Sequence, residues 1–220
     1  MGRPLGGALW VRALPAAARA GGVVHEECMA SLGRLLLRGD PVCPWWLAYT
    51  FDNPLRRLLH DPAVLLAAFV GPGMTAVDLG CGMGHFTLGL ARLVGDAGKV
   101  VAVDVQERML GRVRRRVERA GLASRVRLHQ AGREALQLRV PADFALAFWM
   151  VHEVPDRAAF LREVAALLKP GARLFVAEPR GHVGPEELER TIELAREAGL
   201  RVEGRPRVAL SRAVVFSKPG

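Results

Sequence analysis

The sequence predicts an α/β fold in which helices cover both faces of a mostly parallel, doubly wound sheet of seven strands. Three observations predict it. Apolar strand-like runs alternate with amphipathic stretches from Thr75 onward, glycines crowd the turn after the first run, and the last two runs follow each other around a glycine–proline turn. Alternating strands and helices form βαβ units, whose strands are parallel. The closing pair has no helix between its runs, which predicts one antiparallel strand near the C-terminus.

The first half of this pattern lies between residues 75 and 130. Its strands are short apolar runs, and its helices carry apolar residues three or four positions apart and end near a glycine. In order, we expect a strand at 75–80, a helix at 85–95, a strand at 99–105, a helix at 106–121 and a strand at 125–130.

The second half begins with an unbroken apolar run, as expected of a parallel strand that is covered on both faces. Pro170 and Gly171 are expected to stop the helix that follows, and a later helix has proline at its start and glycine at its end. In order, we expect a strand at 143–151, a helix at 156–171, a strand at 172–179, a helix at 184–199 and two strands within 200–218.

The chain is predicted to have three parts. Residues 74–220 form the α/β domain, and residues 41–73 form an aromatic and helical cap with a helix from Pro54 through Phe69. Residues 1–40 are basic and rich in alanine and glycine, and we expect a partly disordered extension. No apolar run reaches the ~20 residues that span a bilayer. The three cysteines form no disulfide pattern, which favours the cytoplasm.

The net charge of +9 has two interpretations. A basic surface is typical of proteins that bind nucleic acid. However, nearly all the positive charge is arginine in a chain rich in alanine and glycine, which a GC-biased genome also produces. The arginine-rich run at 112–127 lies on a predicted helix that we expect to pack behind the sheet, away from the acceptor.

The stretch "VDLGCGMGHFT" carries the strongest functional signal. Gly80, Gly82 and Gly84 follow the first strand and precede a helix, and Asp104 closes the next strand. In open α/β sheets, ligands bind at the carboxyl ends of the strands. Glycines there let a ligand lie against the backbone, and a carboxylate at the end of the second strand can accept both hydroxyls of a ribose. We therefore expect a nucleotide-like ligand at this turn.

The spacing of the glycines narrows the ligand. A dinucleotide site uses GxGxxG, whereas this loop reads GxGxG, and Asp78 lies two residues before its first glycine. That carboxylate would repel a pyrophosphate and would suit a cationic amino group. The loop thus points away from NAD and toward S-adenosylmethionine, which carries an ammonium and a sulfonium.

At these residues the chain resembles the class I S-adenosylmethionine-dependent methyltransferases. It is most similar to the small-molecule branch that includes the ubiquinone and menaquinone C-methyltransferases. The resemblance covers residues 74–218 and is carried by "VDLGCGMGHF", "VVAVDVQERML", "FWMVHEVPD" and "LLKPGARLFVAEP". It implies a Rossmann-like fold, S-adenosylmethionine as cofactor and methyl transfer to a small-molecule acceptor.

The resemblance also implies which residues contact the cofactor. Asp78, Gly80 and Gly82 line the methionine end, Asp104 holds the ribose, and Gln106 and Met109 lie near the adenine. An acid that many relatives carry after the third strand is replaced by Gly132, so the adenine contact passes to residues 130, 132 or 133. The full predicted set is Asp78, Gly80, Cys81, Gly82, Gly84, Asp104, Val105, Gln106, Met109, Gly132, Arg133 and Phe148.

Two residues after the fourth strand are candidate catalytic groups. His152 and Glu153 lie at the expected mouth of the site, where one of them would orient or deprotonate the acceptor. Alternatively, His152 bonds a loop carbonyl and Glu153 is solvated. The segment lacks the Asn/Asp-Pro-Pro-aromatic run typical of enzymes that methylate amino groups of bases or glutamine. We expect the acceptor to contact Trp45, Trp46, Tyr49, Asn53, Trp149 and Glu178, although the N-terminal aromatic residues could instead pack against the sheet.

Other functions remain open at this point. Cys28 and Cys43 allow a thiol-dependent metalloid methyltransferase, because thiolates are soft ligands. The "HEEC" fragment at 25–28 lacks the spacing of a four-ligand zinc site, so no metal is predicted. An RNA methyltransferase and a cofactor-binding protein without transfer activity are the remaining alternatives. The sequence does not indicate an oligomeric state.

Overall fold

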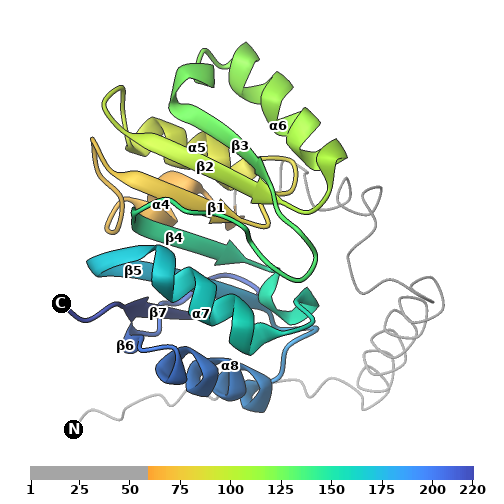
Figure 1. The fold of residues 1–220 in the computed structure, drawn as a ribbon, viewed down its shortest axis with the longest axis vertical. Helices are drawn as coiled ribbons and strands as arrows, with labels where there is room; N and C mark the ends of the chain where they lie inside the picture. The colour runs from red at the N-terminus through yellow and green to blue at the C-terminus, as the bar shows by residue number, and fades with distance from the viewer. Residues whose placement is uncertain (1–58) are drawn as a thin grey trace, which may run out of the picture. The chain divides into compact units, whose positions relative to one another are not determined.

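The computed structural model describes residues 59–220, which contain a single seven-stranded sheet with the strand order β3-β2-β1-β4-β5-β7-β6 (Figure 1). The predicted extension at 1–40 and most of the predicted cap, including Trp45, Trp46, Tyr49 and Asn53, lie outside the described residues. The strands are β1 Thr75–Leu79, β2 Lys99–Asp104, β3 Val126–Gln130, β4 Ala142–Phe148, β5 Leu168–Pro179, β6 Arg201–Gly204 and β7 Ser211–Ser217.

The sheet topology confirms the predicted fold class. β1 lies between β2 and β4 and is parallel to both, with Asp78 opposite Ala102 on one side and Leu146 on the other. β7 is antiparallel to its neighbours β5 and β6. The one antiparallel strand near the C-terminus is therefore β7, and the other strands run in a common direction.

Helices cover both faces of the sheet (Figure 1). Their first turns follow ordinary capping chemistry: the Asp156 carboxylate accepts a 2.8 Å hydrogen bond from the Ala159 N–H, and α8 begins at Pro185 with two glutamates behind it. The helices are α4 Pro62–Leu66, α5 His85–Leu93, α6 Glu107–Arg119, α7 Arg157–Leu167 and α8 Pro185–Glu197, with single 3₁₀ turns at Ala123–Arg125 and Val151–Glu153.

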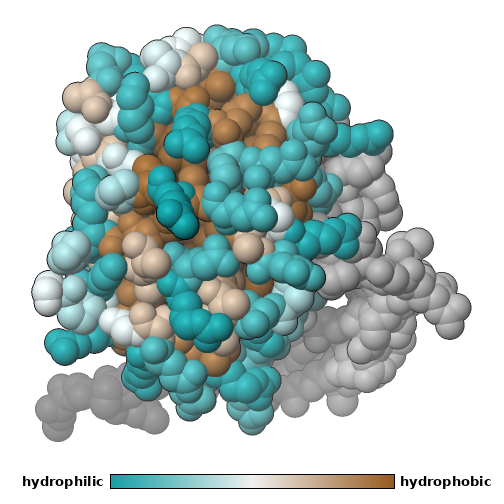
Figure 2. Space-filling view, in the orientation of Figure 1, coloured by the Kyte–Doolittle hydropathy of each residue, from teal (hydrophilic) through white to brown (hydrophobic). Residues whose placement is uncertain are grey.

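The core is divided by the sheet into two layers. Phe144 and Leu146 of β4 pack with α4, α5 and α6, whereas Ala145 and Ala147 pack with α7 and α8. All four side chains are fully buried, which explains why β4 reads as a continuous apolar run. The helices turn hydrophilic residues outward (Figure 2), and within residues 59–220 no helix is long and apolar enough to cross a membrane.

Two predicted boundaries near β5 and β4 were wrong. The helix expected to reach residue 171 ends at Leu167, and β5 begins at once with a bulge that contains Pro170. Lys169 precedes that proline, and a proline disfavours helical backbone at the residue before it. The strand expected to reach residue 151 ends at Phe148, because Trp149 turns the chain with a φ of 60°.

The described end of the predicted Pro54–Phe69 helix is also broken. Asp61 has extended backbone angles and caps α4, which starts at Pro62 and ends at Leu66. The same pre-proline restriction applies here. α4 lies on α5 through a very close approach: a Cβ built on Gly89 would lie 2.2 Å from the Pro62 Cβ. Gly89 is buried in the middle of α5, and its lack of a side chain allows α4 to pack closely against α5.

We expect Gly89→Ala to destabilise the fold by about 1–3 kcal/mol, because the added methyl group overpacks the α4–α5 contact. Gly111→Ala is the matched control, since Gly111 also lies inside a helix but nothing would lie within 4 Å of its Cβ. That change should stabilise the protein by up to about 1 kcal/mol through helix propensity. Urea unfolding of both variants measures the difference, and equal effects would contradict this account of the contact.

Candidate functional site

The loop between β1 and α5 uses its three glycines in different ways. Gly80, Gly82 and Gly84 all have left-handed backbone, with φ of 65°, 51° and 82°. A Cβ on Gly80 would lie 2.9 Å from the Met150 side chain, and one on Gly84 would lie 3.0 Å from Val113. Gly82 has nothing within 4 Å of that position. Two glycines thus allow close packing, whereas the third leaves backbone open to a ligand.

Asp104 connects this loop to α6. Its carboxylate accepts a 2.9 Å hydrogen bond from the Gly82 N–H and a 2.8 Å hydrogen bond from the Gln106 N–H at the start of α6. The residue is 8% exposed. Burial raises the pKa of Asp104 even though these backbone hydrogen bonds lower it. A carboxyl group whose pKa is raised in the native state binds its proton more tightly there than in the unfolded chain. The ligand-free fold therefore loses stability as pH rises through that raised pKa.

Two further predicted residues, Asp78 before the loop and Cys81 within it, have buried side chains. Asp78 is 2% exposed in β1 and accepts a 2.5 Å hydrogen bond from the Thr87 hydroxyl. Burial raises the pKa of the Cys81 thiol, and the charges of Asp78 and Asp104 raise it further. Cys81 therefore stays a protonated, packed side chain. Among residues 59–220, no group of histidines, cysteines and acids could hold a metal. Cys28 and Cys43 lie outside the described residues.

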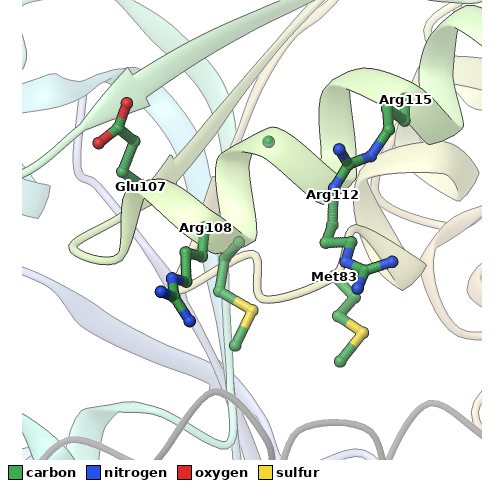
Figure 3. Close-up of a pocket in the computed structure, with 7 residues that line it drawn as sticks. Met83, Glu107, Arg108, Arg112 and Arg115 are labelled. Carbon is green, nitrogen blue, oxygen red and sulfur yellow. The ribbon is translucent and has the colours of Figure 1, made fainter.

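An arginine-lined hollow of about 420 Å³ opens between the loop and α6 (Figure 3). Arg116, one turn further, donates a 2.8 Å hydrogen bond to the Met83 carbonyl and so ties the loop to the helix. α6 starts directly after Asp104 and runs past the loop, so these arginines lie beside the glycine loop. Their expected position away from the acceptor stays a prediction. The lining residues are Met83, Glu107, Arg108, Met109, Gly111, Arg112 and Arg115.

The segment after β3 forms a tight turn beside Asp104. The Ala131 N–H donates to the Asp104 carbonyl at 3.1 Å, and the Gln130 side chain donates to the Val105 carbonyl at 3.4 Å. A Cβ on Gly132 would lie 3.3 Å from the Ala135 carbonyl, so the turn itself favours a small residue there. This packing gives a structural reason why Gly132 stands where many relatives carry an acid. An adenine contact at Gly132 or Arg133 stays a prediction.

The end of β4 carries an aromatic cluster. Phe148 is 5% exposed and contacts Phe86 and His60, with ring centroids 4.4 and 5.0 Å apart. Trp149 is held in its left-handed conformation by a 2.7 Å hydrogen bond from its N–H to the Ala177 carbonyl. Such a conformation costs a bulky residue about 1–3 kcal/mol and is concentrated at functional sites.

Sequence reasoning missed the partners of this cluster. The Trp149 indole donates a 2.9 Å hydrogen bond to the Ser211 hydroxyl, and His60 bonds the Ala209 carbonyl at 2.8 Å. Ser211 begins β7, and His60 precedes α4. Neither residue belongs to a motif, and only the antiparallel pairing of β7 brings Ser211 to this edge of the sheet.

The candidate catalytic residues, His152 and Glu153, lie together in the 3₁₀ turn after β4, with His152 Nε2 3.9 Å from the Glu153 carboxylate. His152 Nδ1 lies 2.5 Å from a carboxylate oxygen of Glu178, a residue that is 1% exposed at the end of β5. The other Glu178 oxygen accepts the Val151 N–H at 2.9 Å. Burial lowers the pKa of His152, but the hydrogen bond and charge of Glu178, then the charges of Glu153 and Glu187, raise it above its ordinary value overall. Glu178 is thus the partner of His152, and the expected contact of Glu178 with the acceptor stays a prediction.

The site as described has two parts, joined where Met150 packs on Gly80. One part is the glycine loop with Asp104 and the start of α6. The other is the segment after β4 with Glu178. Both lie at the carboxyl ends of adjacent parallel strands, around β1, where open α/β folds bind their ligands. This fold and this arrangement of residues are typical of α/β proteins that bind a nucleotide-like ligand.

Comparisons with known proteins find similarity to methyltransferases. The family described as "Methyltransferase domain" matches residues 76–171. A methyltransferase of Aquifex aeolicus described as S-adenosylmethionine-dependent has a solved structure that matches 80% of this chain and 98% of its own, at 28% identity and a TM-score of 0.71. These similarities support the resemblance to the class I S-adenosylmethionine-dependent methyltransferases that the sequence shows.

Two further relatives are similar over part of their length. The ubiquinone/menaquinone biosynthesis C-methyltransferase UbiE of Escherichia coli O1:K1 is 37% identical over 107 residues, which are 48% of this chain and 43% of that protein. The chain thus matches less than half the length of that curated relative. The structure of TrmN from Thermus thermophilus is 26% identical, covers 73% of this chain and 48% of its own, and has a TM-score of 0.57.

We expect Thr87→Val to destabilise the protein by about 1–3 kcal/mol, because it removes the hydrogen bond that the buried Asp78 carboxylate accepts from the Thr87 hydroxyl. Thr191→Val is the matched control. Thr191 is equally buried, but its hydroxyl only bonds the Glu187 carbonyl of its own helix at 3.2 Å. Denaturant unfolding should show a smaller loss for the control. A Thr87 variant as stable as the Thr191 variant would mean that Asp78 is satisfied without this hydroxyl.

Proposed function

We propose that this protein transfers a methyl group from S-adenosylmethionine to a small-molecule acceptor. The observation that carries the proposal is the pairing of Gly82 with Asp104. Gly82 presents open left-handed backbone, and its N–H is held by a buried carboxylate at the end of the neighbouring strand. A loop that served only to join β1 to α5 would not need an open glycine position beside an ionisable group.

The residues present fit the cofactor. Asp104 would accept the ribose hydroxyls, and the backbone from Gly80 to Gly82 would contact the methionine part above Asp78. Gln106 and Met109 at the start of α6 would border the adenine. When bound, S-adenosylmethionine supplies an activated methyl group on a cationic sulfur, so that the acceptor gains the methyl and the carbon–sulfur electron pair stays on sulfur.

The protein's own contribution is then alignment and exclusion of water. Holding a nucleophile in line with the methyl group can supply on the order of 7–11 kcal/mol of the barrier. The ends of β4 and β5 supply the walls, with Phe148 buried and Trp149 fixed by two hydrogen bonds. A small organic acceptor is supported by the similarity to UbiE, a C-methyltransferase of ubiquinone and menaquinone biosynthesis.

The arginine-lined hollow favours one second candidate, methylation of RNA. Arg108, Arg112 and Arg115 lie along one side of α6 at the edge of the loop (Figure 3). A polyanion that contacts all three should lose affinity steeply with salt, at about one log unit of affinity per log unit of salt for each phosphate contacted. Filter binding of a mixed tRNA pool between low and physiological salt distinguishes an RNA methyltransferase from a small-molecule methyltransferase, because the latter should retain little RNA.

Asp104→Asn should weaken S-adenosylmethionine binding by about 10–100-fold, since hydrogen bonds to a charged group contribute about 1.5–3 kcal/mol. Isothermal titration of the full chain measures the affinity. Asp143→Asn is the control: Asp143 also bonds a backbone N–H, that of Thr75, and Lys169, but at the opposite edge of the sheet. The control should bind normally. Unchanged affinity in the Asp104 variant would overturn the proposed cofactor site.

A further inference from the structure

Glu178 is a buried carboxylate that the cofactor site does not use. It lies at the carboxyl end of β5, two strands from β1, with 2% of its side chain exposed. Burying a carboxylate costs several kcal/mol unless it is well partnered. Its partners are the Val151 N–H and His152 Nδ1, both in the segment that follows β4. Both of these hydrogen bonds of Glu178 therefore hold the segment that carries His152.

This contact determines which nitrogen of His152 can accept a proton. An ionised carboxylate only accepts hydrogen bonds, so Nδ1 must carry the proton that joins it to Glu178. In the neutral imidazole, Nε2 then has the free lone pair. Nε2 lies 3.9 Å from the Glu153 carboxylate, which is beyond hydrogen-bond distance, and the His152 side chain is 19% exposed.

The chain places His152 next to the methionine end of the glycine loop. Met150, two residues earlier, packs directly on Gly80. β4 pairs with β1 so that Ala147 lies opposite Leu79, which precedes that glycine. Trp149 turns the chain back at the end of β4, and the 3₁₀ turn Val151–Glu153 follows. His152 is thus held beside the edge where an acceptor would meet the methyl group.

We propose that His152 removes the proton from a hydroxyl group of the acceptor and that Glu178 is its positioning residue. This rests on the proposed methyltransferase function and names the acceptor class: a molecule whose nucleophilic oxygen carries a proton. The O–H bond breaks, the proton joins His152 Nε2, and the oxygen keeps the electron pair with which it bonds the methyl group. The imidazolium that forms is stabilised by the Glu178 carboxylate and later returns its proton to water.

The surrounding charges set the pH at which this base works. Glu178 and Glu153 face the imidazole, Glu187 of α8 acts from further away while paired with Arg157 at 3.1 Å, and the His182 ring lies 5.9 Å off. Together the carboxylates hold the pKa of His152 above its ordinary value. The neutral base is therefore formed as pH rises through that raised pKa. Removing the Glu178 charge should lower the pH at which His152 loses its proton.

The first test is nitrogen NMR of the ¹⁵N-labelled full chain with S-adenosylhomocysteine added. We expect neutral His152 to carry its proton on Nδ1, and to titrate above its ordinary pKa of about 6.5. Glu178→Gln should shift that titration to lower pH, whereas His182→Asn should leave it unchanged. A proton on Nε2, or a titration that does not respond to Glu178→Gln, would overturn the proposal.

The second test uses two acceptor probes of different acidity at about pH 8. Phenol keeps its proton there and needs a base, whereas 4-nitrophenol is largely ionised and does not. With phenol, His152→Asn should lower kcat/KM by about 10²–10⁴-fold, the usual contribution of general base catalysis. With 4-nitrophenol the loss should be less than about tenfold, and His182→Asn should behave as wild type with both probes.

The outcomes separate this proposal from the proposed function. Equal losses with both probes, or methylation of neither probe by the wild-type chain, would contradict His152 as a base for hydroxyl acceptors. Isothermal titration with S-adenosylmethionine is run on the same variants, and His152→Asn and Glu178→Gln should bind it as wild type does. If the wild-type chain does not bind it, the proposed function fails instead.

Discussion

The structure depends most on the carboxylate of Asp104. It accepts N–H groups from Gly82 and from Gln106, so one buried acid orders both the turn after β1 and the first turn of α6. Arg116 holds the other side of the same loop through the Met83 carbonyl. The loop is therefore shaped by contacts within the protein before any ligand arrives, which reduces the entropy that binding would otherwise cost.

The second half of the site follows the same design on the neighbouring strands. Glu178 holds Val151 and His152 through its two oxygens, as Asp104 holds Gly82 and Gln106. In each case a buried acid at the end of a strand fixes the segment that leaves another strand or enters a helix. Met150 on Gly80 connects the two halves. The geometry at the edge of the sheet is thus set by two carboxylates rather than by the loops alone.

Much of this could be read from the sequence, because the informative residues lie in regular elements. Apolar runs and helical spacing located β1, β2 and α6, and the glycines with Asp104 indicated the edge of the sheet where we propose that the cofactor binds. Boundaries next to Pro62 and Pro170 were less predictable, since periodicity does not show where a proline forces the chain to leave a helix. The pairing of Glu178 with His152 could not be found either. It joins residues 26 positions apart and depends on the register of β4 and β5 and on the left-handed turn at Trp149.

The reversed direction of β7 has a practical consequence for handling the protein. Because this strand runs against its neighbours, its first residue, Ser211, meets Trp149 at the ligand edge, whereas its far end reaches the opposite edge. There the Lys218 ammonium bonds the Ala165 and Leu168 carbonyls at 2.9 and 2.8 Å. A fluorophore, affinity handle or surface tether attached beyond Lys218 would therefore leave the proposed cofactor and acceptor site unobstructed.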